Sequence, residues 1–115
     1  MIGDTGYAAY CAAKSGLLGL TGCVAFEGAP HGVTCNAISP SNVLSDQGLI
    51  SLRQEIAMGC ITVRLETHLA RLAEDVPQKR WIQAEEVAAV ALPLCRDEAR
   101  GLTMENVRIA GGSLW

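Results

Sequence analysis

Tyr10 and Lys14 are the two residues of this sequence whose types and spacing point most directly to chemistry. They stand four positions apart, so a helix over residues 8–28 would place the phenol and the ammonium one turn apart on one face. A nearby fixed positive charge favours the ionised form of a phenol. Such a tyrosine could exchange a proton with a carbonyl or alcohol oxygen. The alternative is a tyrosine packed at a helix edge beside a solvated lysine, and the spacing alone fits both.

Three further segments follow this pair in a definite order: residues 32–43 (GVTCNAISPSNV), residues 85–88 (EEVA) and the double glycine at 111–112. Together with the Tyr10-x-x-x-Lys14 spacing they resemble the C-terminal half of the short-chain dehydrogenase/reductase family. The run around Tyr10 and the tail of the chain most resemble 3-oxoacyl reductases and 3-hydroxybutyrate or related hydroxyacyl dehydrogenases. Three separated motifs in register make the resemblance specific.

The resemblance implies an NAD(P)-dependent oxidoreductase that transfers hydride between a carbonyl and a secondary alcohol. Tyr10 would be the proton donor or acceptor, and Lys14 would assist its ionisation and bind the nicotinamide ribose. Both would therefore contact the cofactor, together with Pro40, Val43 and Ser45 of the next loop. In that loop Val43 would give a backbone contact to the carboxamide, and Ser45 would stand where the family usually has threonine. The resemblance leaves the choice between NAD and NADP open.

The sequence departs from the family pattern at three places. Ser41 follows Pro40 where most members have glycine; if that position needs a positive φ, a side chain costs about 1–2 kcal/mol there. Ala110 stands where an aspartate commonly precedes the double glycine. The family's catalytic serine lies about a dozen residues before the tyrosine, which would fall before Met1.

The expected fold class is α/β, as the C-terminal half of a Rossmann-like doubly wound parallel sheet. Strands alternating with helices are typical of parallel sheets built from right-handed crossovers. The N-terminal cofactor-binding half, with its glycine-rich phosphate turn, is expected to be missing from these residues. The expected elements are a catalytic helix at 8–28, a strand at 33–38, substrate-lid helices within 46–80, a helix at 84–95 and a last strand at 104–109.

Because that half is expected to be missing, a second hypothesis stays open. The chain could be a catalytically silent fragment that acts only as an oligomerisation or assembly piece, since apolar faces left exposed in a monomer usually find a partner. A third hypothesis is that another polypeptide supplies the missing half. In either case Gly16, Gly19 and Gly22 would allow the helix to approach another backbone closely. We expect a homo-oligomer through the 8–28 helix and the last helix and strand.

Composition sets the remaining expectations. Half of the 115 residues are apolar, which fits a buried globular segment. The net charge of −3 arises from interspersed signs with no basic stripe, so no nucleic-acid partner is expected, and the partner that the resemblance implies is a small-molecule carbonyl or alcohol substrate. The uncharged run Ser15–Phe26 is shorter than the ~20 residues of a membrane span, so no membrane association is expected. The five cysteines are spread without metal-ligand spacing, which predicts buried thiols in a cytoplasmic protein and no metal site.

Overall fold

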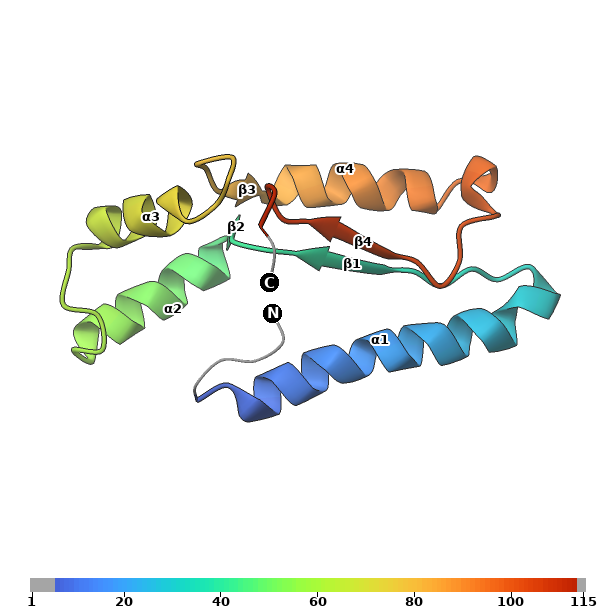
Figure 1. Cartoon of the computed structure of the whole chain (residues 1–115), viewed down its shortest axis with the longest axis horizontal. Helices are drawn as coiled ribbons and strands as arrows, with labels where there is room; N and C mark the ends of the chain where they lie inside the picture. The colour runs from blue at the N-terminus through green and yellow to red at the C-terminus, as the bar shows by residue number, and fades with distance from the viewer. Residues whose placement is uncertain (1–5, 114–115) are drawn as a thin grey trace. The chain divides into compact units, whose positions relative to one another are not determined.

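The computed structural model describes residues 6–113, in which short parallel strands alternate with helices (Figure 1). This arrangement confirms the predicted α/β class. The chain divides into two compact units, one containing the segment up to Ser39 together with Ala89–Arg108, and the other containing Pro40–Ala88 and the segment from Ile109. In chain order the elements are α1 (Ala8–Gly28), η1 (Ala29–His31), β1 (Ala37–Pro40), β2 (Val43–Leu44), α2 (Asp46–Ala57), α3 (Leu65–Glu74), β3 (Ile82–Gln83), α4 (Ala84–Leu94), η2 (Asp97–Ala99) and β4 (Asn106–Ile109).

In the first unit, α1 occupies the range expected for the catalytic helix. The helix passes into η1 and ends at Gly32, whose φ of 70° is a left-handed conformation that glycine adopts without strain. The Gly32 amide donates to the Ala29 carbonyl (3.1 Å), and the Val33 amide donates to the Gly28 carbonyl (3.1 Å). These bonds close the end of the helix and turn the chain toward β1.

The strands β1 and β4 pair in parallel. The Ala37 amide donates to the Glu105 carbonyl (2.8 Å), and the Ser41 amide donates to the Ile109 carbonyl (3.0 Å). The bonded partners advance together along both strands, as the two arrows in Figure 1 show. Because parallel neighbours cannot be joined by a tight turn, the long segment between them must cross over through helices.

The expected strand at 33–38 is wrong in its bounds, since β1 begins only at Ala37. The preceding residues bond to a loop instead of to a strand. The Cys35 amide donates to the Thr103 hydroxyl (3.2 Å), and the Cys35 carbonyl accepts from the Met104 amide (2.8 Å). A side-chain acceptor interrupts the regular backbone ladder there, and a β-favouring composition does not reveal such a bond.

Most of α1 is uncovered within this chain. Ala25 is its only buried residue, while Leu20 is 58% exposed and Phe26 is 76% exposed. Gly16, Gly19 and Gly22 form a glycine row on this helix, and outside the helix's own backbone no atom lies within 4 Å of where a Cβ would lie on any of them. The described residues of this chain leave most of the helix exposed, and the expected approach of the three glycines to another backbone stays a prediction.

The segment Ala8–His31 is long and apolar enough to cross a membrane by length and composition, and an 18-residue window within it has a mean hydropathy of 1.3. The expectation that no run reaches this length is wrong, because it counted only the uncharged residues and omitted the flanking ones that still allow a span. Core helices of soluble proteins meet the same two criteria, so the finding does not by itself indicate a membrane.

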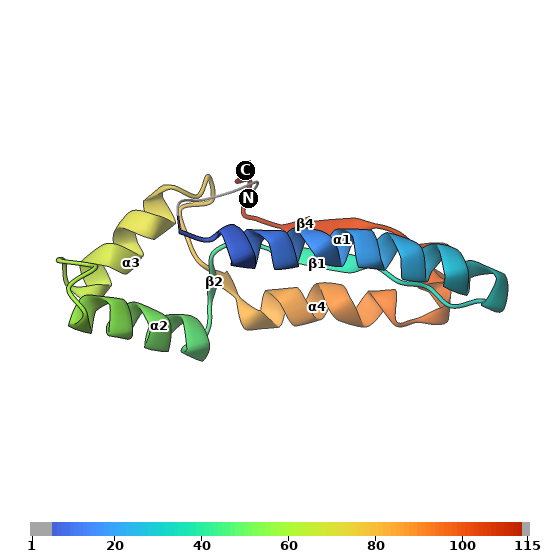
Figure 2. The same ribbon diagram turned by 90° about the horizontal axis from the view of Figure 1, so that it is seen from below.

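In the second unit, α2 and α3 lie side by side in both views (Figures 1 and 2), in the region expected to hold the lid helices. The strands β2 and β3 pair in parallel, with Val43 opposite Ile82 and Leu44 opposite Gln83. This two-residue pair was not expected from the sequence, because so short a strand carries no periodic pattern. It is nevertheless the element that fixes the start of α2 relative to the start of α4.

The double glycine closes the second unit. Val76 is 1% exposed, and the Gln78 amide donates to the Gly111 carbonyl (3.0 Å). Gly111 has φ of 57°, and a Cβ there would lie 2.7 Å from Val76 Cγ1. Gly112 is similarly tight, at 3.0 Å from Pro77 Cβ. Both positions therefore require the absence of a side chain.

We expect Gly111→Ala to lower the free energy of unfolding by about 2–4 kcal/mol, because it combines left-handed strain with overpacking against Val76. Gly101→Ala is the matched control, since a Cβ at Gly101 would meet nothing within 4 Å. Urea denaturation followed by circular dichroism measures both. Equal stability of the two variants would show that the approach of Gly111 to Val76 does not constrain the fold.

Candidate active site

Lys14 and Tyr10 lie together on α1. The Lys14 ammonium is 5.6 Å from the centroid of the Tyr10 ring, within the range of a cation–π contact. The contact forms because positions four apart on a helix are neighbours. Tyr10 is 55% exposed, so the residue lies at the surface of the first unit. The geometry supplies an accessible phenol with a positive charge held over its ring.

The segment from the end of β1 to the start of α2 contains the three expected cofactor-binding residues. It begins at Pro40, the last residue of β1, and continues through Ser41 and Asn42 to Val43 and Ser45. Among the described residues of this loop, the positive φ falls on Asn42 (38°). Asparagine tolerates this conformation better than most residues. The strain considered for Ser41 is therefore absent, and its replacement of glycine leaves the loop backbone intact.

Val43 presents its backbone to one side of β2. The Ile82 amide donates to the Asn42 carbonyl (3.1 Å), and Val43 stands opposite Ile82 in the parallel register. In a parallel pair, a residue bonds to the two chain neighbours of the residue that lies opposite it. Ile82 therefore bonds on the two sides of Val43, and the Val43 N–H and C=O point away from β3. One donor and one acceptor on the same residue match the complementary pair that a primary carboxamide presents.

Ser45 is the N-cap of α2. Its side-chain oxygen accepts a hydrogen bond from the Gly48 amide (3.2 Å), and its backbone is extended. Serine before an acidic first turn is a recognisable helix-start pattern, so this role was readable in the sequence. The hydroxyl keeps its own hydrogen for donation to another group. Ser45 thus holds the end of the loop at a fixed point.

These residues fall into two groups. Tyr10 and Lys14 are brought together in the first unit, and Pro40, Val43 and Ser45 are brought together in the second. Each group has its own fixed geometry, set by α1 in one case and by the β2–β3 pair in the other.

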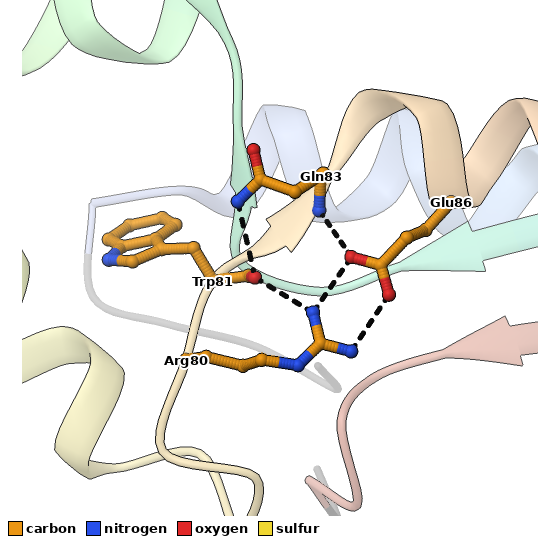
Figure 3. A network of polar contacts seen from close by, with 4 residues as sticks. All are labelled: Arg80, Trp81, Gln83 and Glu86. Carbon is orange, nitrogen blue, oxygen red and sulfur yellow. Dashed lines mark hydrogen bonds and ion pairs between the residues drawn. The ribbon is translucent and has the colours of Figure 1, made fainter.

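A polar network that the sequence analysis missed fixes β3 and the start of α4 (Figure 3). The Arg80 guanidinium makes two bonds of 2.8 Å to the Glu86 carboxylate, and Glu86 also accepts the Gln83 amide (2.8 Å). The bond from the Gln83 amide to the Glu86 carboxylate is half of a capping box, in which the side chain of the third helical residue accepts the backbone amide of the N-cap residue. The three-residue spacing of Gln83 and Glu86 was the signal in the sequence that could have predicted this bond. The Trp81 indole adds a bond to the Leu69 carbonyl of α3 (3.0 Å).

The network changes the acidity of one carboxyl. The Arg80 hydrogen bond, aided by the Gln83 amide, lowers the pKa of Glu86 from 4.5 to about 2. Both side chains are partly exposed, at 48% for Arg80 and 37% for Glu86, so solvent screens their attraction. The main effect of the network is therefore geometric, because it holds Gln83 beside Leu44 in the strand pair that carries the loop.

The cysteines differ from expectation. Cys23, Cys60 and Cys95 are exposed, and Cys11 and Cys35 are half-buried, so the prediction of buried thiols is wrong for this chain. Two of them lie on α1, whose apolar surface is uncovered, and this explains part of the difference. Within residues 6–113 no group of three or more His, Cys, Asp or Glu side chains could hold a metal ion.

Comparison with known proteins identifies relatives along almost the whole chain. Residues 2–113 match the family described as enoyl-(acyl carrier protein) reductase. The oxidoreductase YxjF of Bacillus subtilis is 36% identical over 97% of this chain, and D-beta-hydroxybutyrate dehydrogenase of Rhizobium meliloti is 38% identical over 90% of it. The match covers 43% and 40% of those two proteins, so this chain spans about two fifths of their length.

A solved structure gives the same result for the fold. The actinorhodin polyketide ketoreductase, crystallised with NADPH as an F189W variant, superposes with a TM-score of 0.85 at 28% identity. The superposition covers 96% of this chain and 41% of the ketoreductase. It confirms the expectation of a partial Rossmann-like fold.

We expect Glu86→Gln to lower the melting temperature at pH 7, with an effect that depends on pH. The folded carboxyl has a depressed pKa, so its ionised form stabilises the fold above about pH 4.5, and this stabilisation is lost as the pH falls toward 2. The difference in melting temperature between the wild type and Glu86→Gln should shrink over that range. Glu85→Gln, which removes the neighbouring carboxylate of the same helical turn, is the control. A difference that is constant from pH 7 to pH 3 would contradict this assignment.

Proposed function

This chain belongs to the short-chain dehydrogenase/reductase family, and from that membership we propose that it carries out NAD(P)-dependent interconversion of a carbonyl and a secondary alcohol. The observation that carries the proposal is the Lys14 ammonium held over the ring of the accessible Tyr10 phenol. Family members reported above are oxidoreductases or dehydrogenases, and this favours an enzyme over a silent assembly piece.

Tyr10 is the proposed proton donor and acceptor. In the reductive direction its hydroxyl gives a proton to the substrate oxygen, and in the oxidative direction the phenolate removes one. The negative charge that remains on the phenolate is stabilised by the ammonium of Lys14, which the helix holds in place. A bound nicotinamide cofactor would supply or accept the hydride.

The loop residues fit such a cofactor. The outward N–H and C=O of Val43 complement a carboxamide, and Ser45 fixes the end of the loop by capping α2. Pro40 limits the backbone where the loop leaves β1. Lys14 would also donate to the nicotinamide ribose, as the family resemblance implies. The crystallised ketoreductase, which contains NADPH, supports the use of NAD or NADP here.

We further propose that α2 and α3 form a lid over the substrate, and that copies of the protein associate through α1 and the last helix and strand. The exposed Leu20 and Phe26 and the open glycine row support this association, because large exposed apolar surfaces favour a partner. Sedimentation velocity should show a dimer or larger species. A single monomeric species at micromolar concentration would contradict the association.

Tyr10→Phe tests the proton-transfer role. We expect kcat to fall by about 10²–10⁴-fold with folding unchanged, because only the exchangeable proton is lost. Turnover of a carbonyl substrate is followed by the absorbance of NADH or NADPH, and circular dichroism checks the fold. Tyr7→Phe removes the one other phenol hydroxyl in the sequence and serves as the matched control. Near-normal turnover by Tyr10→Phe would refute the assignment.

Lys14→Ala tests the second role. We expect weaker cofactor binding and about 10²-fold lower turnover, since this change removes both the charge beside the phenol and a donor to the ribose. Fluorescence titration with NADH or NADPH measures the affinity. Arg53→Ala, which removes an exposed positive charge on α2, is the control. Unchanged affinity and rate in Lys14→Ala would mean that Lys14 is a solvated surface residue.

A further inference from the structure

The ring of Tyr10 has a second neighbour besides Lys14. The centroid of the Tyr7 ring lies 6.2 Å from that of Tyr10, and the ring planes are 77° apart, which is an edge-to-face arrangement. This geometry is favourable because the positive edge of one ring meets the negative face of the other. The contact lies at the start of α1, where the Tyr7 carbonyl accepts the Cys11 amide (2.8 Å).

The position of Tyr7 is fixed by the helix that it begins. Tyr7 is the N-cap residue of α1, and its side chain makes no capping hydrogen bond. Its backbone is held by the bond to Cys11, so the ring projects from an anchored point one turn before Tyr10. The side chains of both tyrosines are about half exposed, at 50% and 55%. The packing of the rest of the chain therefore does little to restrict the Tyr10 ring.

The contacts of the Tyr10 ring with Lys14 and Tyr7 are thus the main restraint on the Tyr10 side chain. Lys14 contacts the ring at 5.6 Å from its centroid, and Tyr7 contacts it edge to face. A half-exposed tyrosine otherwise samples several staggered rotamers. A general acid must meet the reacting oxygen within hydrogen-bonding distance, so the orientation of the phenol directly affects the rate of proton transfer.

We propose that Tyr7 is a positioning residue for the reaction, holding the Tyr10 ring through its own ring in the orientation that Lys14 and the substrate require. The proposal rests on the proposed function, in which Tyr10 exchanges a proton with the substrate. The Tyr7 hydroxyl has no part in it. The role depends on an aromatic ring at position 7, which separates it from a role in hydrogen bonding or in general packing.

The test compares Tyr7→Phe, which keeps the ring, with Tyr7→Leu, which removes it. The kcat of Tyr7→Phe should stay near the wild-type value. The kcat of Tyr7→Leu should fall by about threefold to tenfold, the range expected for the loss of one aromatic pair. KM for the carbonyl substrate and the affinity for NADH or NADPH should change little in either variant. Tyr7→Met serves as a second ring-free variant in case Tyr7→Leu does not fold.

A spectroscopic measurement tests the contact separately from catalysis. The sequence has two tyrosines, so each variant has Tyr10 alone, and its ring protons can be followed by NMR without ambiguity. The ring current of a phenylalanine at position 7 should shift the Tyr10 signals relative to Tyr7→Leu. Identical Tyr10 signals in the two variants would show that the rings do not touch and would overturn the proposal.

The outcomes also distinguish this proposal from the proposed function. If the wild type turns over and Tyr7→Leu has the same kcat, the positioning role is refuted and the function stands. If Tyr7→Phe loses as much activity as Tyr7→Leu, the hydroxyl matters and the ring-based role is wrong. If the folded wild type shows no turnover of NADH or NADPH with carbonyl substrates, the proposed function fails and the positioning role fails with it.

Discussion

Parallel pairing between distant segments is the constraint on which the rest of this structure depends. The pairs β1–β4 and β2–β3 each join strands that are separated by dozens of residues, and parallel strands need a crossover between them. The helices α2, α3 and α4 are those crossovers. The same constraint brings the loop after β1 to the carboxyl end of its strand, which is where ligands bind in open α/β sheets. The placement of the candidate site residues Pro40, Val43 and Ser45 is thus a consequence of the strand pairing.

Local hydrogen bonds, an ion pair and a helix cap fix the ends of these short strands. The two-residue pair β2–β3 could not hold its register by itself, because isolated short strands are marginal in water. Arg80, Glu86 and the Gln83 amide hold one of its strands, and the Ser45 cap holds the other where α2 begins. The left-handed Asn42 turns the chain into β2. These contacts fix the Val43 backbone that we propose as a cofactor contact.

The sequence predicted well what depends on long patterns. The apolar run between Ala8 and Gly28 coincides with α1, and the four-residue spacing of Tyr10 and Lys14 corresponds to the observed contact between their side chains. Contacts between distant residues could not be predicted, because one sequence does not show which segments meet. Cys35 illustrates this, since its bond to Thr103 displaces the start of β1. The exposed cysteines likewise depend on which surfaces this chain leaves uncovered.

The measurement that tests the central claim most directly is a titration of the purified protein with NADH and NADPH. Cofactor fluorescence reports binding, and circular dichroism on the same sample reports the fold. We expect saturable binding of at least one of the two cofactors by a folded protein, because the outward N–H and C=O of Val43 complement a nicotinamide carboxamide. A folded sample that binds neither cofactor would contradict it.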